Sequence, residues 1–290
     1  MGSIRADLRT KIAAAEPIRS VGEAVAFFSS IPSDTEEFLI FRGHADYDWR
    51  MSPPINRSSV TVRERENELV REIVSVAPRE FQFDQTMFDR LVRMQHFGIP
   101  TRLLDTTSNP LVALYFATEA TPEDDDGAVV VVRGKRSERK FYDSDTVSCL
   151  TNLANLTVEE RATIEGTTAR NVAEFNKLQA TDRLIQFIRS EKPSFRARVR
   201  HADLFSRVHV VPKMSNPRIV AQSGSFVVFG LDRTKLPSTS VTMELDRLRV
   251  DAGAKGAIRQ ELASLGVTES ALFPELDKAA SYIVRRMSEA

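Results

Sequence analysis

Three stretches of the 290-residue chain place polar side chains where an apolar run would otherwise continue. The first is the tripeptide Phe41-Arg42-Gly43, at the end of the apolar segment 37–42. An arginine at the end of a buried strand is costly unless it meets an anion, because its guanidinium is always charged and donates in a planar fork. Gly43 would let the backbone turn sharply or approach a ligand. Arg42 therefore either clamps a phosphate or a ribose, or pairs with an internal carboxylate such as Asp105.

The second stretch runs from His96 to Pro110 and holds a histidine, an arginine, an aspartate and several hydroxyl groups. Asn109 followed by Pro110 is typical of a helix start, because Asn caps the free N–H groups and proline has a helical φ. A helix start beside an arginine and hydroxyl groups is a natural cradle for an anion or a ribose. The alternative is a well-capped helix whose hydroxyl groups satisfy only the backbone. The candidate ligand-binding residues here are Thr101, Arg102, Thr106, Thr107 and Asn109.

The third stretch runs from Arg218 to Phe226, where Gln222 and Ser223 interrupt what reads as a strand. A glutamine side chain can orient a ligand by hydrogen bonds, but it is no general base. The structural alternative is a β-bulge at Gly224.

Several common sites are absent from the sequence. No two glycines stand in G-x-G spacing, and neither a Walker A motif nor a G-x-S-x-G motif is present. The four histidines and the single cysteine show no zinc-ligand spacing, so no metal is expected. The sequence His44-x-Asp46-x-Asp48 could hold a cation, but a polar loop is the better interpretation.

The composition disfavours a protein that binds polyanions over its whole surface. Forty basic residues balance forty acidic ones, which gives a formal net charge of zero. Two local basic runs, 133–140 and 189–200, leave nucleic-acid binding open as an alternative. A lone Cys149 favours a reducing compartment, and no apolar run reaches the length of a membrane span. We expect a cytoplasmic protein with no membrane partner; its oligomeric state does not follow from the sequence.

The hydrophobic pattern predicts an α+β fold with small mixed or antiparallel sheets and helical elaborations. A mostly helical insert is expected at 141–205 and a helical C-terminal segment at 244–288. The other expected helices are 3–15, a helix from Ser20, 63–77, Asp84 to Phe97, and 110–120; the expected strands are 37–42, 101–105, 128–132, 208–211, 219–222 and 226–229.

These motifs resemble the FRG domain family, which is named for the tripeptide at 41–43. The resemblance covers about residues 18–288, so a single FRG domain is expected. Members of this family occur in bacteria and phages, often in contexts that suggest defence or toxin roles. The residues that carry the resemblance are Trp49, Pro53, Arg57, the block from Gln95 to Ala117, Tyr142 to Asp145, Glu191 to Pro193, Asn216 to Ile219, Gln222 to Phe226, Lys255 to Ile258, and Leu272 to Pro274.

A second resemblance is to ADP-ribosyltransferases of the Arg-Ser-Glu type. Asp105-Thr106-Thr107 stands at the right distance before Val112 to Ala117 to be similar to their second motif. The resemblance implies that Arg42 clamps the phosphate or the nicotinamide-side ribose of NAD, and that Thr107 supports the nicotinamide pocket. The catalytic glutamate of that family corresponds best to Gln222, which is not an acid.

This departure leaves several functions open. In the preferred function, Arg42 and Arg102 hold phosphate, and Asp105 or His96 handles the ribose hydroxyl or a proton. Gln222 completes the set of catalytic residues. The remaining residues that line the ligand site are Phe41, Gly43 and Ser223. NAD is then the candidate substrate of an ADP-ribosyltransferase or an NAD-cleaving effector in a bacterial toxin or antiphage system, with a protein or nucleic acid as a possible acceptor. The alternatives are a non-enzymatic sensor of a nucleotide or phage component, and a nucleic-acid binder or nuclease.

Overall fold

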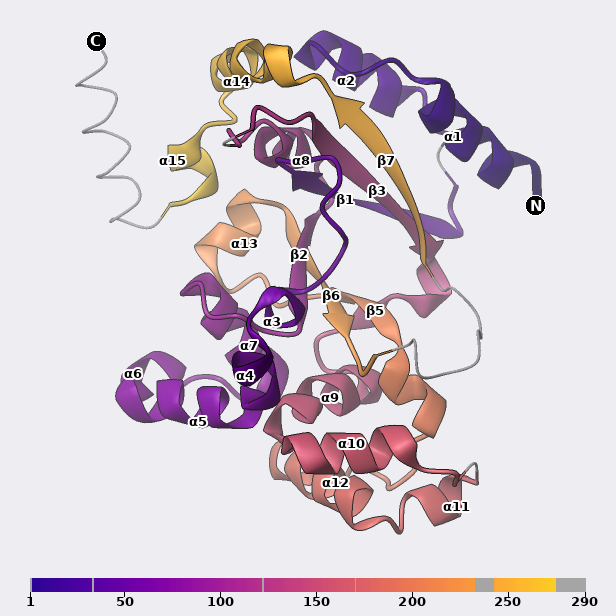
Figure 1. Cartoon of the computed structure of the whole chain (residues 1–290), viewed down its shortest axis with the longest axis vertical. Helices are drawn as coiled ribbons and strands as arrows, with labels where there is room; N and C mark the ends of the chain where they lie inside the picture. The colour runs from indigo at the N-terminus through magenta and orange to yellow at the C-terminus, as the bar shows by residue number, and fades with distance from the viewer. Residues whose placement is uncertain (1, 33, 122, 170, 233–242, 275–290) are drawn as a thin grey trace.

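The fold is α+β and contains one seven-stranded sheet, in the order β4-β5-β6-β2-β1-β3-β7 (Figure 1). The computed structural model describes residues 2–32, 34–121, 123–169, 171–232 and 243–274. Every neighbouring pair of strands is antiparallel except β4 and β5. The predicted fold class is thereby confirmed, whereas the likeness to ADP-ribosyltransferases stays a prediction. The strands are β1 (Glu37–His44), β2 (Leu103–Thr107), β3 (Gly127–Lys135), β4 (Lys140–Phe141), β5 (Arg207–Val211), β6 (Gly224–Phe229) and β7 (Met243–Val250).

Strand β3 lies within the sheet, between β1 and β7, and all of its residues except Lys135 are buried. Its centre is a run of four valines, which pack well on a pleated surface that is covered on both faces. This explains why an unbroken apolar run forms a strand here without the alternation of a half-exposed one.

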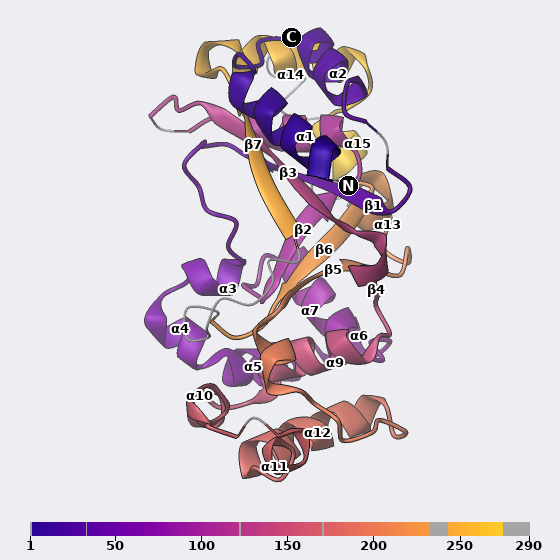
Figure 2. The same ribbon diagram turned by 90° about the vertical axis from the view of Figure 1, so that its right-hand side faces the viewer.

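Two groups of helices cover the sheet, one at each end (Figures 1 and 2). The first group packs on β1, β3 and β7 and consists of α1 (Gly2–Ala14), α2 (Val21–Ser29), α8 (Pro110–Ala117) and α14 (Lys255–Ser264). The second packs near β5 and β6 and includes α5 (Glu66–Val76), α7 (Met87–His96), α9 (Asp145–Asn152), α10 (Val158–Gly166) and α12 (Gln179–Glu191). Each group has its own apolar core, so the two ends of the sheet are packed separately.

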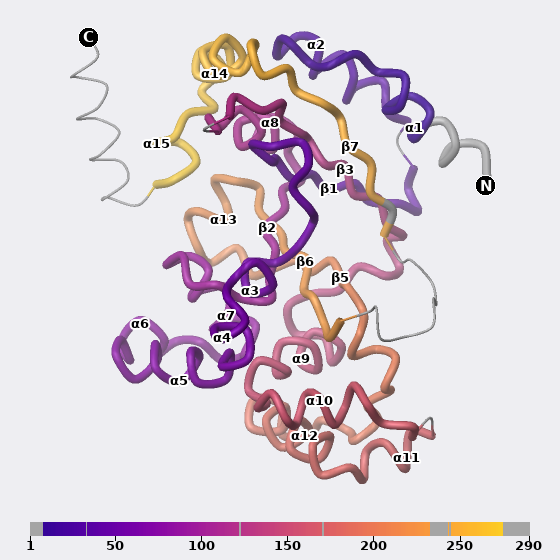
Figure 3. Tube along the Cα trace, in the orientation of Figure 1, coloured from indigo at the N-terminus to yellow at the C-terminus, as the bar shows by residue number. Residues whose placement is uncertain are grey.

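Shorter helices connect these parts, and the Cα trace of Figure 3 follows them. They are α3 (Pro54–Arg57), α4 (Val60–Glu64), α6 (Pro78–Phe81), α11 (Val172–Phe175), α13 (Pro217–Ala221) and α15 (Glu269–Leu272), with 3-10 turns at Arg136–Glu138, Leu153–Asn155, His201–Phe205 and Ala252–Ala254.

The sheet is nearly divided between β1 and β2. These strands share a single register pair, Phe41 with Thr107, whereas β1 and β3 share eight pairs along their whole length. On the other side, β2 pairs with β6 over five residues. The two halves, β1-β3-β7 and β2-β6-β5-β4, therefore join at one point and diverge beyond it.

Two predicted elements are wrong. Residues 219–222 were expected in a strand, but 217–221 form helix α13, because Asn216 caps it through the Arg218 N–H and Pro217 occupies its first turn. The expected helix at 244–288 begins instead with strand β7, in which the buried Leu248 and Val250 alternate with arginines. That alternation has a period of two residues, which fits a strand.

Other predictions hold with shifted boundaries. The insert 141–205 is mostly helical, and Thr157 forms a capping box with Glu160 at the start of α10. Helix α7 is capped by Thr86 and not by Asp84, and it ends before Gly98, whose φ of +76° suits a glycine. The part of the predicted C-terminal helix beyond Pro274 lies outside the described residues. Among the described residues, no helix combines the length and apolar character that crossing a membrane requires.

The tightest contact at the split is between β1 and α8. A Cβ atom on Gly43 would lie 2.0 Å from the Ala113 carbonyl oxygen and 2.6 Å from the Ala117 nitrogen. Gly43 is therefore needed for the close approach of strand and helix. Gly43 thus has a packing role, whereas its expected role in the ligand site stays a prediction.

We predict that Gly43→Ala lowers the free energy of unfolding by about 3 kcal/mol, the upper end of typical overpacking costs, because backbone atoms must move. Chemical denaturation measures this change. The matched control is Gly256→Ala in α14, where a Cβ would meet nothing within 4 Å; it should be neutral or stabilising by up to about 1 kcal/mol. Equal stability of the two variants would contradict the packing role.

Candidate functional site

A cavity of about 150 Å³ opens where β1 and β2 diverge. It brings together residues from β1, β2, the loop after β1, α8 and α13. We call it the split-sheet cleft; it is lined by Phe41, Arg42, Gly43, Ala45, Trp49, Asp105, Thr106, Thr107, Val112, Phe116, Glu119, Arg218 and Gln222.

Arg42 bridges the two diverging strands. Its Nη1 donates to the backbone carbonyl of Asp105 at 2.7 Å, and its Nε donates to Nε2 of His44 at 3.2 Å. Burial lowers the pKa of Arg42, while the nearby charges of Asp105 and Glu119 raise it. Within the part of the chain that the structure describes, Nη2 of Arg42 has no hydrogen-bond partner and no carboxylate forms an ion pair with this side chain. Nε and Nη1 of Arg42 thus bond to the protein, whereas Nη2 is available to an anion.

His44 must be neutral to accept that hydrogen bond. Burial is the main cause that lowers its pKa to about 3, and the neighbouring Arg42 and Arg247 lower it further. With 2% of its surface exposed, the ring stays uncharged at neutral pH and fixes the orientation of Arg42.

The Asp105 side chain is held by a chain of two hydrogen bonds that begins at Thr101, outside the cleft. Its carboxylate accepts from Nε2 of Gln95 on α7 at 2.6 Å, and the amide oxygen of Gln95 accepts from the hydroxyl of Thr101. Thr101 is almost completely buried and does not line the cleft. It acts as a positioning residue for Asp105 and not as the ligand-binding residue that was expected.

Glu119 is an acid at the cleft that no sequence motif indicated. It follows α8 by two residues and lines the cleft at its rim. Partial loss of hydration around the carboxyl raises its pKa, against the lowering influence of Arg259 and Arg42. No described residue donates a hydrogen bond to this carboxylate. The signal in the sequence was weak, because an acid after a helix end is common on protein surfaces.

Trp49 and Arg218 complete the rim. Trp49 comes from the loop after β1, and 45% of its surface is exposed although the residue lines the cleft. Its ring lies 6.2 Å from the ring of His44. The Arg218 guanidinium lies over the Phe273 ring at 4.7 Å. The exposed indole of Trp49 offers a stacking surface for a planar ligand group, and Arg218 adds a positive charge to the same cleft.

Gln222 lies in the cleft at the end of helix α13. The side-chain Nε2 of Gln222 donates to the Leu272 backbone carbonyl at 3.0 Å. The backbone carbonyl of Gln222 accepts from the Thr107 hydroxyl at 2.7 Å. These bonds tie α13, β2 and α15 together. Among described residues, the side-chain oxygen of Gln222 has no donor, so it is available to a ligand only as an acceptor.

His96 lies in an adjoining hollow of about 30 Å³, whose lining shares Asp105, Thr106, Arg218 and Gln222 with the cleft. Its ring packs edge-on against Phe97, with the ring centroids 5.2 Å apart. The Thr106 hydroxyl, on the shared wall, is 2.8 Å from that of Ser225. His96 therefore approaches the site from the α7 side of β2.

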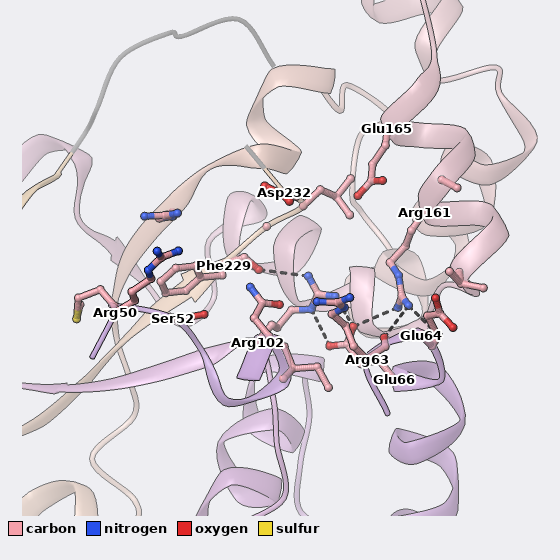
Figure 4. Close-up of a pocket in the computed structure, with 18 residues that line it drawn as sticks. Arg50, Ser52, Arg63, Glu64, Glu66, Arg102, Arg161, Glu165, Phe229 and Asp232 are labelled. Atoms are coloured by element: carbon pink, nitrogen blue, oxygen red, sulfur yellow. Dashed lines mark hydrogen bonds and ion pairs between the residues drawn. The ribbon is translucent and has the colours of Figure 1, made fainter. Parts of the chain in front are cut away.

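Besides Thr101, three more of the predicted ligand-binding residues lie outside the cleft. Asn109 caps α8 by accepting from the Leu111 N–H at 2.9 Å. Ser223 has a φ of +47°, and its carbonyl accepts from the Ser108 N–H in the turn before β6. Arg102 forms a buried ion pair with Glu66 and lines a separate, larger cavity (Figure 4). Arg42 and Arg102 thus do not hold one phosphate between them.

The residues of this site do not suggest a metal centre. Throughout residues 2–32, 34–121, 123–169, 171–232 and 243–274, no three side chains of His, Cys, Asp or Glu gather in the arrangement of a metal site.

The family comparison agrees with the resemblance seen in the sequence. Residues 37–126, from β1 to the loop before β3, match the family model described as the FRG domain. The chain thus carries an FRG domain, and the family prediction is confirmed; the wider limits of 18–288 stay a prediction. Comparisons with curated proteins and with solved structures find no match. The matched segment contains Arg42, Trp49, Asp105, Thr107 and Glu119, which are five of the residues that line the cleft.

We predict that acidification below pH 6.5 destabilises the protein through His44. Its ordinary pKa is 6.5 and its folded pKa is about 3, so only the unfolded chain binds this proton between those values. The contribution of His44 to the free energy of unfolding is therefore fully present above pH 6.5. It decreases as the pH falls towards 3, by up to about 1.4 kcal/mol per pH unit.

The variant His44→Gln, whose amide oxygen can still accept from Arg42, should make the free energy of unfolding less dependent on pH between 4 and 6. Some dependence should remain, because burial also lowers the pKa of His209 to about 4. Urea denaturation at several pH values measures both slopes. An unchanged slope in His44→Gln would refute the assignment.

Proposed function

We propose that the split-sheet cleft of this FRG domain binds the nicotinamide end of NAD and that the protein breaks the N-glycosidic bond there. The observation that carries the proposal is the combination of three groups on one cavity: Nη2 of Arg42, which has no partner among the residues that the structure describes, the exposed indole of Trp49 and the carboxylate of Glu119. The resemblance of the residues around Arg42 and Thr107 to ADP-ribosyltransferase motifs supports the same substrate.

The size and polarity of the cleft fit one end of a dinucleotide. A volume of about 150 Å³ is below the roughly 300–1,000 Å³ of sites that enclose a drug-sized ligand. It suits a ring with part of its ribose, while the phosphates lie towards the open rim. There Arg42 Nη2 and the Arg218 guanidinium supply positive charge, and Trp49 supplies a planar face.

In the proposed reaction, the bond between the ribose C1′ and the nicotinamide nitrogen breaks. Its electron pair goes to the nicotinamide ring and neutralises the ring's positive charge, which leaves an oxocarbenium-like sugar. A carboxylate fixed in the cleft stabilises that positive charge. An oxygen of water or of an acceptor then bonds to C1′ and gives its proton to a base.

Glu119 and Asp105 divide these roles in the proposal. Asp105 is fixed by Gln95, so it is suited to electrostatic stabilisation and to orienting the ribose. Glu119 has no donor among the described residues and its pKa is raised, so it is suited to accept a proton. The proposed catalysis therefore does not require an acid at position 222, where the amide of Gln222 accepts a ligand hydrogen bond.

The biological setting belongs to the same proposal. An enzyme that consumes NAD or modifies a cellular protein or nucleic acid would act as a toxin or as an antiphage effector. The occurrence of similar FRG-domain proteins in bacteria and phages supports this setting.

A second candidate function is a sensor that binds a nucleotide without cleaving it. It is favoured by the bonding of Gln222, whose side chain holds α15 through Leu272 and lies where an acid would be expected. A ligand that contacts Gln222 would then act on the position of α15. This candidate predicts ligand binding with no turnover.

We predict that the pure protein releases nicotinamide from NAD, and that Glu119→Gln and Arg42→Lys each reduce the rate at least a hundredfold. Removing one charged group from a cleavage site commonly costs this much. Mass spectrometry over time, with water, cell protein, RNA and DNA as acceptors, measures the release. Glu72→Gln, an exposed glutamate on α5, is the matched control and should keep the rate of the wild type.

Each variant is first tested for folding by its melting temperature, because Arg42 also holds two strands together. NAD at about 100 times its dissociation constant should stabilise the wild type by roughly 2.7 kcal/mol. Binding without nicotinamide release favours the sensor. A folded protein that neither binds nor consumes NAD refutes the proposed function.

A further inference from the structure

A second, larger cavity has a volume of about 640 Å³ and is lined in part by residues that follow Trp49 in the chain (Figure 4). We call it the arginine cavity, because five arginines line it together with four acidic residues. The charged residues are Arg50, Arg63, Arg102, Arg161, Arg207, Glu64, Glu66, Glu165 and Asp232. None of its lining residues lines the split-sheet cleft.

The floor of the cavity is a buried Arg-Glu-Arg triad. Glu66 accepts from Nε of Arg102 at 3.0 Å and from Nη1 of Arg161 at 3.1 Å. The three side chains are between 4% and 10% exposed. Two positive charges share one negative charge, so the triad carries a net charge of +1. Three more acidic residues and three more arginines line the cavity, so the lining as a whole also carries a net charge of +1, which an anion would offset.

Two further arginines are free to bind such an anion. Arg50 and Arg63 are exposed, and within the described part of the chain neither guanidinium has a hydrogen-bond partner. The backbone at Arg63 is itself fixed, because its carbonyl accepts from Nη2 of Arg161 at 3.1 Å. The Ser52 hydroxyl and the Asn56 amide also line this wall and add neutral hydrogen-bonding groups. These groups suit the oxygens of a phosphate chain.

One end of the cavity is suited to an uncharged ring. Phe229 is buried and lies at the Arg50 end, while Arg161 lies at the other end (Figure 4). The Arg207 guanidinium lies 5.0 Å from the centroid of the Phe229 ring, so the two form a stacked pair. Glu165 and Asp232 line a further wall and can accept hydrogen bonds from hydroxyl or amino groups of a ligand.

We propose that the arginine cavity binds a nucleoside polyphosphate, with the phosphate chain running from Arg63, beside the triad, towards Arg50, and the base beyond it, near Arg207 and Phe229. The volume lies within the range of sites that enclose ligands of this size. This site is independent of NAD cleavage in the split-sheet cleft.

The test is calorimetric titration of the full chain with ATP, GTP, CTP, UTP and inorganic pyrophosphate. At least one nucleoside triphosphate should bind, and tenfold or more tighter than pyrophosphate. Arg50→Gln and Arg63→Gln should each raise its dissociation constant at least tenfold, and the double variant at least a hundredfold. Both positions are exposed, so the variants should melt at the temperature of the wild type without ligand.

The matched control is Arg196→Gln, which removes one exposed positive charge outside the cavity and should leave the binding unchanged. The double variant should also keep whatever rate of NAD consumption the wild type has, which separates this inference from the proposed function. The inference is overturned if no triphosphate binds, or if the double variant binds as tightly as the wild type. Equal affinity for pyrophosphate, or preferred binding of a single-stranded oligonucleotide, would also overturn it.

Discussion

The hydrogen bond from Arg42 Nη1 to the Asp105 carbonyl is the constraint on which the site depends. Strands β1 and β2 meet at only one register pair and then diverge, so backbone groups at the gap lose their usual ladder partners. Arg42 closes this gap with a charged side chain in place of a strand. Because the gap is bridged and not filled, a cavity remains beside the guanidinium.

Other contacts turn this bridge into a site of fixed shape. His44 accepts from Nε of Arg42 and must be neutral to do so. Gly43 lets β1 lie directly against α8, and the end of α8 in turn places Glu119 at the rim. The tripeptide Phe41-Arg42-Gly43 therefore has two separable roles: its arginine bridges and binds, and its glycine sets the distance between strand and helix.

Local signals in the sequence predicted a substantial part of this arrangement. The Asn109-Pro110 start of α8, the apolar runs of β1, β3 and β6, and the helical insert are all determined by neighbouring residues. The polar interruptions also predicted that Arg42, Asp105, Thr107 and Gln222 would meet. The helix α13 was misassigned because its five residues are as apolar as a strand, although its Asn-Pro start repeats that of α8.

What the sequence could not predict depends on contacts between distant segments. Arg102 has the same residue type and a similar apolar setting as Arg42, but its partner Glu66 lies 36 positions earlier. No periodicity reveals such a pair, so the two arginines were placed in one site. Glu119 was missed for the same reason, since only the packing of α8 on β1 brings that carboxylate to the cleft.

The most direct test of the central claim is a crystal structure of the protein with NAD, or with a non-hydrolysable analogue, bound. The account predicts that an oxygen of the ligand lies within hydrogen-bond distance of Arg42 Nη2, with the nicotinamide or its ribose between Glu119 and Asp105. It also predicts that Arg42 still donates to the Asp105 carbonyl. A ligand found away from this cleft, or an Arg42 that leaves Asp105 to bind it, would contradict the account.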